Sequence, residues 1–347
     1  MNPFCEHKIL SHLPVLGKYL SREWYPPIQV EVDLTNACTS ACPWCAGFLD
    51  REQHPHVLLG HGGTMAESMR QSVGPVMALI EEFASLGVKS VTWTGGGDPS
   101  LHPWLPAFLA HARSLGLDNG LITNGVIDVV ECVPYCQWVR FSVDASTREG
   151  YAKQHGRAQH WDRVLEHVRK AAMAKGSTTI GVGFVTSPQV VEEIEAFPLL
   201  WRDVPVDYIQ YRPIMDHYGC RYEMDHQAVA VKVQAAGLLD ARVVKSEAKY
   251  QAQCHGQGGT TERCHGIFLE TAIAADGKVY ACCHLKGLEQ YAIGSLEEES
   301  FADIWARHLQ TPEFRTTEDC SRWCRHYGTN QFIEEHVLVE RSHRNFI

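Results

Sequence analysis

Three cysteines lie close together in the first part of the chain: Cys38, Cys42 and Cys45, in a C-x3-C-x2-C pattern. This spacing lets three thiolates converge within one turn of chain and hold three corners of a cubane iron-sulfur cluster, which leaves one iron without a protein ligand. A metal site with an open position can bind substrate or cofactor directly, whereas a site with four protein ligands is usually structural. A zinc site and three unrelated buried thiols are the alternatives.

A second set of candidate ligands lies near the C-terminus: Cys264, Cys282, Cys320 and Cys324. The first two flank predicted strands over residues 268–274 and 278–281, and Asp276-Gly277 between these strands is typical of a hairpin turn. The hairpin would bring both thiols to its same end. The last two cysteines could close the site from beyond a predicted helix over residues 300–309, and a structural zinc ion is again the alternative to a cluster.

The composition is that of a globular chain from a reducing compartment. The chain has 347 residues, 45% of them hydrophobic, and 13 cysteines. This length predicts one large domain with a smaller appendage, and 31 basic against 41 acidic residues argue against a broad nucleic-acid surface. No signal peptide and no run of about 18 apolar residues is evident. We therefore expect a soluble cytoplasmic protein with no membrane partner, whose cysteines serve as metal ligands or catalytic thiols.

Short β-branched runs alternate with helical patterns from residue 28 onward, which is typical of βα units around a parallel sheet. The predicted strands span residues 28–34, 88–93, 120–123, 138–143, 178–185 and 208–212. The predicted helices span residues 73–86, 105–115, 160–174 and 190–200. We predict an α/β fold with three parts: an N-terminal extension over residues 1–27, a partial (β/α)6 TIM barrel over 28–245, and a small cysteine-rich domain over 246–347.

The first cysteine loop, with the aromatic Trp44 before its last cysteine, resembles the signature of the radical S-adenosylmethionine (SAM) superfamily. Gly95-Gly96-Gly97-Asp98 follows the second predicted strand and resembles the family's glycine-rich segment, which contacts the methionyl amino group of the cofactor. Glycine lets the backbone approach a ligand closely, and an acidic side chain can pair with an ammonium group. The family more often carries Glu at the position of Asp98, whose side chain is one methylene shorter.

Two further segments at strand ends resemble cofactor contacts of the same family. Ser142 and Asp144, at the end of the fourth strand, resemble the positions that hydrogen-bond the carboxylate and the ribose hydroxyls of SAM, with turn capping as the alternative. Asn124, after the third strand, matches the family less specifically and could be a turn residue alone. The resemblance covers about residues 28–215, at motifs rather than throughout.

The resemblance implies a reaction as well as a fold. A reduced 4Fe-4S cluster would donate one electron to bound SAM, and the resulting 5′-deoxyadenosyl radical would take a hydrogen atom from the substrate. The electron donor would be a flavodoxin- or ferredoxin-like protein. The substrate pocket should lie at the carboxyl ends of the strands, by analogy with complete barrels. Tyr211 and Arg212, which end the sixth strand, are candidates for carboxylate contacts, and Cys220 in the next loop is a candidate hydrogen-atom donor.

The C-terminal cysteines resemble the SPASM and twitch modules that bind auxiliary clusters. Cys264, Gly277 and Cys282 follow the opening pattern of these modules, C-x9-15-G-x4-C. A complete SPASM module has seven cysteines, and the run that it needs after Cys282 is missing here. We therefore expect a single auxiliary 4Fe-4S cluster of the twitch type, with four thiolate ligands, that passes electrons. Substitutes for one of these ligands could be Cys283, Cys254 or His284.

About 28 residues precede the first predicted strand, too few for a leader-peptide recognition domain, and this favours a small polar substrate. We predict net oxidation, or a related radical transformation such as decarboxylation, of a sugar, cyclitol or nucleoside. The alternatives are a peptide epimerase or maturase, with Cys220 as hydrogen donor, and a non-catalytic metal-binding scaffold. His54, His56 and His61 lie in a predicted loop over residues 50–65, which is expected to cover the pocket rather than to bind metal.

Overall fold

The computed structural model describes residues 6–45, 73–214, 223–245, 250, 261–317, 319–320 and 324–339. Within them, parallel strands follow one another along the chain: β1 (Gln29–Asp33), β2 (Ser90–Thr94), β3 (Asp118–Thr123), β4 (Trp138–Ser142), β5 (Thr179–Thr186), β6 (Tyr208–Pro213) and β7 (Val243–Lys245). Further strands extend the sheet: β8 (Glu270–Ile273), β9 (Lys278–Tyr280) and β10 (Ala292–Ser295). The whole sheet has the order β10-β9-β8-β1-β2-β3-β4-β5-β6-β7.

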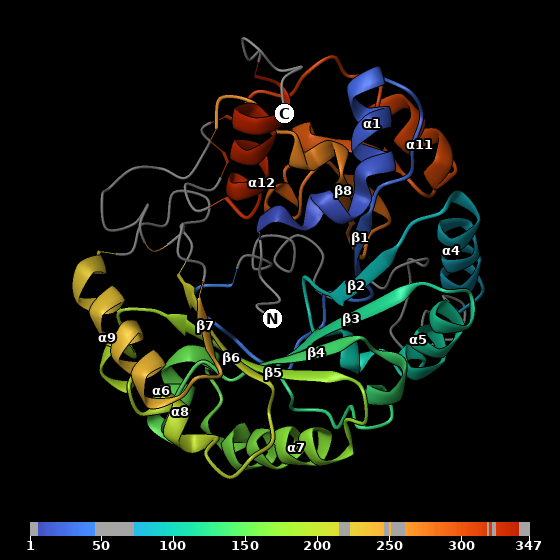
Figure 1. Cartoon of the computed structure of the whole chain (residues 1–347). Helices are drawn as coiled ribbons and strands as arrows, with labels where there is room; N and C mark the ends of the chain where they lie inside the picture. The colour runs from blue at the N-terminus through green and yellow to red at the C-terminus, as the bar shows by residue number, and fades with distance from the viewer. Residues whose placement is uncertain are drawn as a thin grey trace.

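Helices surround this sheet, which curls into an open barrel (Figure 1). The described helices are α1 (Leu13–Ser21), α4 (Val73–Leu86), α5 (Leu105–Ser114), α6 (Arg148–His155), α7 (Trp161–Ala174), α8 (Phe197–Leu200), α9 (His226–Leu239), α11 (Phe301–His308) and α12 (Tyr327–Phe332). Helices α4 to α9 lie on the outer side of the barrel, and α1, α11 and α12 lie beside the C-terminal strands. The predicted α/β fold is confirmed. None of the described helices is long and apolar enough to cross a membrane.

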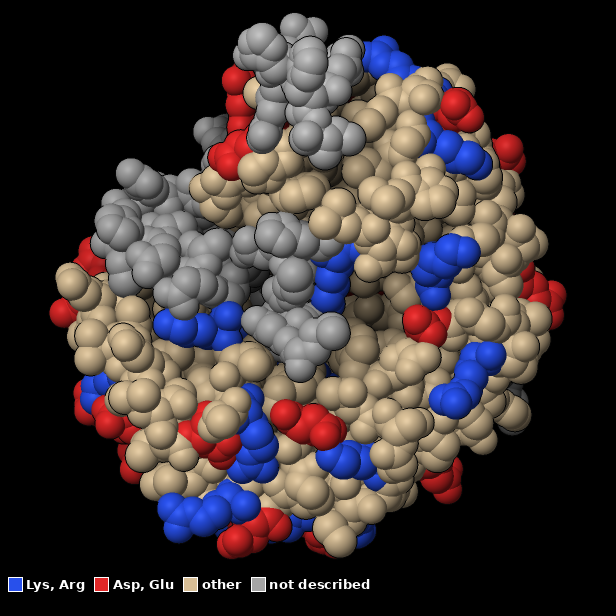
Figure 2. Space-filling model, viewed as in Figure 1, with Lys and Arg blue, Asp and Glu red and all other residues tan. Residues whose placement is uncertain are grey.

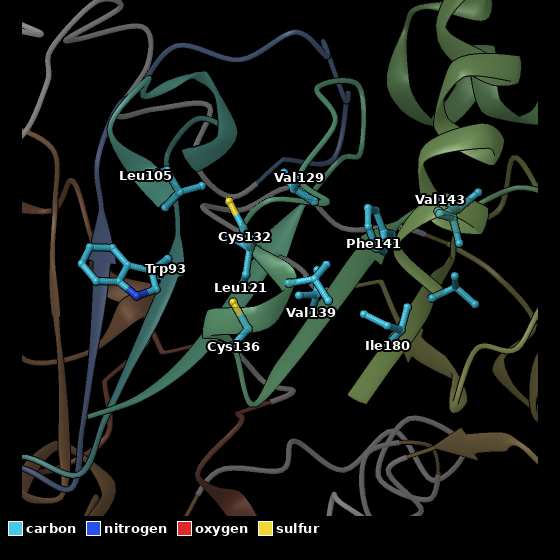
Figure 3. Close-up of a cluster of buried hydrophobic side chains, with 14 of the residues drawn as sticks. Trp93, Leu105, Leu121, Val129, Cys132, Cys136, Val139, Phe141, Val143 and Ile180 are labelled. Carbon is cyan, nitrogen blue, oxygen red and sulfur yellow. The ribbon is translucent and has the colours of Figure 1, made fainter. Parts of the chain in front are cut away.

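Side chains of the strands alternate between an apolar outer face and a polar inner face. In β1, Val30 and Val32 are fully buried in the core between sheet and helices, while Glu31 and Asp33 point to the inner face. Figure 3 shows part of this core, in which Trp93, Leu105, Leu121, Val129, Cys132, Cys136, Val139, Phe141, Val143 and Ile180 pack together. Charged and polar side chains at the strand ends therefore face the inside of the barrel.

The C-terminal hairpin continues the sheet of the barrel. Strand β8 pairs in parallel with β1, and β9 returns antiparallel to β8. The turn between them has Gly277 at φ 84°, a left-handed conformation that favours glycine. The predicted hairpin is confirmed, and the module that follows is joined to the barrel by backbone hydrogen bonds. The predicted domain boundaries stay predictions.

Most predicted helices and strands begin and end within two residues of the observed ones. The predicted helix over residues 190–200 is an exception. The sequence predicts one helix here, whereas the segment contains a short 3-10 turn, Val191–Glu193, followed by the single-turn helix α8. Pro198 explains the break, because proline has no N–H to donate and fits only the first turn of a new helix. Helices α6 and α9 and strand β7 are not predicted from the sequence.

Candidate functional site

The N-terminal cysteine loop follows β1 and packs against the glycine-rich segment that follows β2. The Gly97 N–H donates to the Thr35 carbonyl at 2.9 Å, and the Asp98 N–H donates to the Ala37 carbonyl at 2.8 Å. A Cβ atom at Gly97 would collide with that Ala37 carbonyl. The residue before Cys38 is therefore held by a close backbone contact that only glycine permits.

The cysteine sulfurs of this loop are half-exposed and receive polar contacts from neighbouring elements. The Ser40 N–H donates to Cys38 Sγ at 3.4 Å, and Asn124 Nδ2 donates to the same sulfur at 3.6 Å. Nδ1 of His155, at the end of α6, lies 3.3 Å from Cys42 Sγ. Hydrogen bonds to the sulfurs stabilise thiolates and help to set the potential of an iron-sulfur cluster. The surroundings of the sulfurs therefore fit a cluster held by thiolates.

Among the described residues, no three His, Cys, Asp or Glu side chains converge as the ligands of one metal ion would. A zinc site requires such convergence around a single ion. In a cubane cluster each thiolate binds a different iron, so its sulfurs stand further apart. Cys45, the third cysteine, is half-exposed, and its N–H donates to the Cys42 carbonyl at 3.3 Å.

The Asp98 carboxylate is buried and already engaged by the protein. Its Oδ1 accepts from the Ser100 N–H at 3.0 Å, and its Oδ2 accepts from the Asn124 N–H at 2.6 Å. The Thr123 hydroxyl also donates to it. Burial raises the pKa of Asp98, although these donors act to lower it. The carboxylate therefore joins the glycine-rich segment to the end of β3, from which Asn124 reaches the cysteine loop.

Asp144 follows β4 in a left-handed backbone conformation, at φ 59°. Its Oδ1 accepts from the Val185 N–H at 2.7 Å, and its Oδ2 lies 3.3 Å from His155 Nε2. The Asp144 carboxylate therefore joins the end of β4 to the neighbouring strand β5. Ser142 ends β4 and is half-buried. The contacts of both residues with SAM stay predictions.

The end of α6 forms a platform for the cysteine loop. The Trp44 indole N–H donates to Gln154 Oε1 at 2.8 Å, and the Ala41 N–H donates to the His155 carbonyl at 2.9 Å. Gly156 ends the helix in a left-handed conformation, at φ 68°, and a Cβ atom at this position would lie 3.1 Å from the Ala41 carbonyl oxygen. Trp44, predicted as a cofactor contact, is thus bound to α6 through its indole nitrogen.

His155 is fully buried between the cysteine loop and β4. Its Nε2 faces the Val143 carbonyl at 3.2 Å and the Asp144 carboxylate, while its Nδ1 faces Cys42. Burial acts to lower the pKa of His155, but the Cys42 sulfur and the Asp144 carboxylate outweigh it and raise the pKa to about 10. A negatively charged sulfur at Cys42 and the Asp144 carboxylate therefore both favour the protonated form of the imidazole.

Neighbouring residues of β6 face opposite sides of the sheet, and this separates two predicted substrate contacts. Tyr211 is fully buried on the helix side, where its hydroxyl donates to the Ile194 carbonyl at 2.6 Å. Arg212 faces the inner side, where its Nη2 lies 3.9 Å from Asp144 Oδ1. The structure therefore corrects the prediction for Tyr211, which packs in the core, and keeps Arg212 beside the candidate cofactor contacts.

Arg140 on β4 lies beside Arg212. Its Nη1 donates to Gln210 Oε1 at 2.8 Å. Burial, assisted by the charge of Arg212, lowers the pKa of Arg140 to about 9. The Nε atoms of both arginines are buried without a hydrogen-bond partner among the described residues. Two guanidinium groups with unused donors suit a carboxylate or another anion.

Lys and Arg side chains are interspersed with Asp and Glu around a central hollow on the face shown in Figure 2.

The C-terminal cysteines come together from separate segments. Cys264 and Cys282 lie in one apolar cluster at the end of the hairpin, 6% and 8% exposed. Burial raises the pKa of Cys264, and the nearby Cys320 adds to the increase. Contact with Cys283, then burial, raises the pKa of Cys282 well above its usual range, and Cys324 adds to the increase. Cys320 therefore lies near Cys264, and Cys324 lies near Cys282, while their role as ligands of one cluster stays a prediction.

Two of the substitute ligands lie among the described residues. Cys283 accepts from Arg325 Nη1 at 3.2 Å, packs against the apolar cluster and contacts Cys282. His284 lies in a described 3-10 turn directly after it. The predicted residues that lie outside the described ones are Cys220, Cys254, His54, His56 and His61.

Buried charges connect the C-terminal module to the barrel. Lys286 Nζ donates to Asp33 Oδ2 at 2.6 Å, and the same oxygen accepts from the Gly96 N–H at 2.9 Å. Arg325 pairs with Glu31 on the same strand, β1. The Asp33 carboxylate therefore links Lys286 of the module to Gly96 of the glycine-rich segment.

Sequence reasoning missed four residues of this site: Asp33, Arg140, His155 and Lys286. The sequence does give a signal for Asp33 and Arg140. Each follows a buried valine in a strand whose side chains alternate with a period of two residues, so each is expected on the inner face of the sheet. His155 had a weaker one, because Thr147 caps α6 and Gly156 ends it. Lys286 had none, because its partner is 253 residues away in the sequence.

Two family models match the chain. The radical SAM superfamily model matches residues 32–197, and the SPASM iron-sulfur cluster-binding domain model matches residues 264–326. The first range contains the cysteine loop and the strand ends around it. The second contains all four candidate ligands of the auxiliary site.

Two curated relatives match part of the chain. A PqqA peptide cyclase of Xanthomonas oryzae pv. oryzae is 37% identical over 101 residues, which make up 29% of this chain and 23% of that protein. An S-adenosylmethionine-dependent nucleotide dehydratase of Lacinutrix mariniflava is 30% identical over 129 residues, 36% of this chain and 25% of that protein. The chain thus matches about a quarter of the length of each relative.

Solved structures share the fold at low sequence identity. Streptococcus suis SuiB bound to S-adenosylmethionine has a TM-score of 0.63 at 13% identity, over 88% of this chain and 71% of that chain. The enzyme anSMEcpe bound to S-adenosylmethionine and a peptide has a TM-score of 0.60 at 12% identity, over 87% of each chain. Both structures confirm the architecture of barrel and C-terminal module.

The family models, the fold and the cysteine loop agree with the prediction from sequence. The predicted cofactors, SAM and 4Fe-4S clusters, are those of the two matched families. The chain belongs to the radical SAM superfamily and carries a C-terminal SPASM iron-sulfur cluster-binding domain.

Proposed function

We propose that the chain is a radical SAM enzyme that modifies a peptide. The observation that carries this proposal is the 37% identity with a PqqA peptide cyclase over 101 residues. Of the structures that share the fold, SuiB was solved with its precursor peptide and anSMEcpe with a peptide. A peptide maturase, one of the alternatives from the sequence, is therefore favoured over an enzyme that acts on a small hydroxylated metabolite.

The chain's own residues divide the work of holding the cofactors. Cys38, Cys42 and Cys45 would hold the cluster, and SAM bound at the open iron supplies a radical that abstracts a hydrogen atom from substrate. The Asp98 carboxylate is occupied by Ser100 and Asn124, among others. We therefore assign the ammonium contact to backbone carbonyls of the glycine-rich segment, which Asp98 holds in place.

On the inner face of the barrel, Arg140 and Arg212 offer buried Nε groups without partners among the described residues. A carboxylate can accept two parallel hydrogen bonds from a guanidinium group. We assign to this pair a carboxylate of the bound cofactor or of the peptide. In either case the pair would help to hold the reacting carbon in one position, which is the main contribution of a protein to cofactor chemistry.

The auxiliary cluster would be held by Cys264, Cys282, Cys320 and Cys324. With four protein ligands it would have no open iron, and the chemistry that it would supply is electron transfer. If it accepted a second electron from the substrate, the net reaction would be a two-electron oxidation. A flavodoxin- or ferredoxin-like protein remains the proposed external electron donor.

The substrate class can be tested with extracts of the source cells. The anaerobically reconstituted protein is mixed with SAM, a reductant and the fraction of extract below about 5 kDa, and formation of 5′-deoxyadenosine is measured. We expect the extract to stimulate the reaction and protease treatment of the extract to remove this stimulation. Stimulation that survives protease would contradict a peptide substrate.

The type of reaction follows from the product. Deuterium from solvent in the product peptide would indicate epimerisation with a thiol as hydrogen donor. A product two hydrogens lighter than the peptide would indicate cyclisation or another oxidation. Loss of carbon dioxide would indicate decarboxylation. The comparison with a PqqA peptide cyclase favours the product lighter by two hydrogens.

A nucleotide or another small metabolite is the second candidate substrate. It is favoured by the 30% identity with a nucleotide dehydratase over 129 residues. The arginine pair on the inner face also suits a phosphate group. The protease step separates this candidate from a peptide, because a nucleotide withstands the treatment.

A further inference from the structure

The cysteine loop is held on one side by the last residues of α6, and His155 is the centre of this contact. The ring nitrogens of His155 contact three groups of the barrel site. Its Nδ1 lies 3.3 Å from Cys42 Sγ, and its Nε2 lies 3.2 Å from the Val143 carbonyl and 3.3 Å from Asp144 Oδ2. The side chain is 2% exposed, so water does not compete for these contacts.

The partners of the two ring nitrogens determine where the protons lie. The Val143 carbonyl and the Asp144 carboxylate can only accept, so Nε2 carries a proton. A cysteine that binds iron is a thiolate, which also only accepts. Nδ1 must then carry a proton as well, because two acceptors cannot share a hydrogen bond. With the cluster bound, His155 Nδ1 is therefore placed to donate a hydrogen bond to Cys42 Sγ.

We propose that His155 is a positioning residue that raises the reduction potential of the SAM-binding cluster by donating a hydrogen bond to Cys42 Sγ. This inference rests on the proposed function, since it requires the N-terminal cysteines to hold the cluster. The cluster becomes more negative when it takes up one electron from the 2+ to the 1+ state. A hydrogen-bond donor at a ligand sulfur stabilises the reduced form more than the oxidised form.

A pair of substitutions separates this role from packing. In His155→Asn, the amide nitrogen is as many bonds from Cα as Nδ1, so a donor to Cys42 is retained. In His155→Gln, the amide nitrogen takes the place of Nε2, so the donor to Cys42 is lost while the contact with Val143 is kept. His167→Gln is the matched control, because His167 also bonds a carbonyl, that of Gly125 at 2.8 Å, and contacts no cysteine among the described residues.

The measurement is a redox titration followed by electron paramagnetic resonance, on reconstituted holoprotein. The SAM-binding cluster is identified by the change of its signal when SAM is added, which distinguishes it from the auxiliary cluster. At a fixed potential, we expect the ratio of reduced to oxidised cluster to fall about tenfold in His155→Gln, equivalent to about 59 mV for one electron. His155→Asn and His167→Gln should stay close to the unaltered protein.

The titration distinguishes failure of this inference from failure of the proposed function. An unchanged potential in His155→Gln, or equal shifts in His155→Gln and His155→Asn, would overturn the role of the hydrogen bond while leaving the cluster in place. An unaltered protein with no signal that responds to SAM would overturn both. A selective shift in His155→Gln supports the proposal.

Discussion

The two cysteine sites of this protein are built in opposite ways. In the N-terminal site, the three proposed ligands lie on one loop of eight residues, their side chains are half-exposed, and side chains of other elements contact them. In the C-terminal site, the four proposed ligands are spread from Cys264 to Cys324, and two of them flank the hairpin of β8 and β9. The first set is therefore local in the chain, whereas the second depends on contacts between separate segments.

The surroundings of the sulfurs differ in the same sense. The N-terminal loop receives contacts from side chains of the strand ends and of α6, such as Asn124 and His155. In the C-terminal site the contacts come from within the module, as when the His326 N–H donates to Cys324 Sγ at 3.3 Å. Side chains of the barrel therefore contact the N-terminal cysteines, whereas the C-terminal cysteines are contacted mainly by residues of their own module.

The largest effect should come from removing a ligand of the open site. Cys42→Ala leaves the cluster with two cysteines, so we expect 5′-deoxyadenosine formation to fall to the level found without protein. The control is Cys132→Ala, because Cys132 is 3% exposed and packs in the apolar core. Continued cofactor cleavage by Cys42→Ala would show that the open site lies elsewhere.

Removing a ligand of the closed site should have a partial effect. Cys282→Ala is expected to lower the iron content by about half, since one of two expected 4Fe-4S clusters is lost. Some 5′-deoxyadenosine should still form, but product formation should fail, because the second electron has no acceptor. An iron content equal to that of the unaltered protein would place the auxiliary cluster on other ligands.

The connection between the two sites can be broken at Lys286. Lys286→Met leaves the buried Asp33 carboxylate without its cation, so we expect the free energy of unfolding to fall by about 3–5 kcal/mol. SAM affinity should fall too, because Asp33 also holds the Gly96 N–H. Lys153→Met, which removes an exposed pair with Glu149, should leave the free energy of unfolding and the SAM affinity close to those of the unaltered protein. Equal effects of both changes on SAM affinity would contradict the connection.

The smallest effect is expected from a single added methyl group in the open site. In Gly97→Ala the new Cβ meets the Ala37 carbonyl, and we expect stability to fall by about 1–3 kcal/mol, with weaker SAM binding measured by calorimetry. Gly74→Ala on α4 is the control, because a Cβ there meets open space. A Gly97→Ala protein that binds SAM normally would show that the cysteine loop tolerates displacement.

The sequence predicted the local parts of this arrangement well. The spacing of the three N-terminal cysteines and the turn at Asp276-Gly277 are set by neighbours in the chain, so the sequence alone is enough to predict them. The βα alternation predicted the strands for the same reason. The face of Tyr211 could have been predicted as well, since Ile209 and Tyr211 alternate with polar residues in β6.

Contacts between distant segments could not be predicted. The carboxylate of Asp98 looked like a cofactor ligand because its position matches a motif, yet its partners at Thr123 and Asn124 come from the next strand end. The bond between Lys286 and Asp33 likewise depends on which strand lies beside β1. Such partners are decided by packing, which a single sequence does not record.

The pairing of β8 with β1 has a consequence for the barrel taken alone. Each residue from Gln29 to Val32 has a partner in β8, so a chain cut off after residue 245 would present this side of β1 to water with unpaired N–H and C=O groups. Exposed strand edges of this kind recruit strands from other chains and lead to aggregation. The C-terminal module therefore also covers this edge of the sheet, and truncation should yield insoluble protein rather than a simpler enzyme.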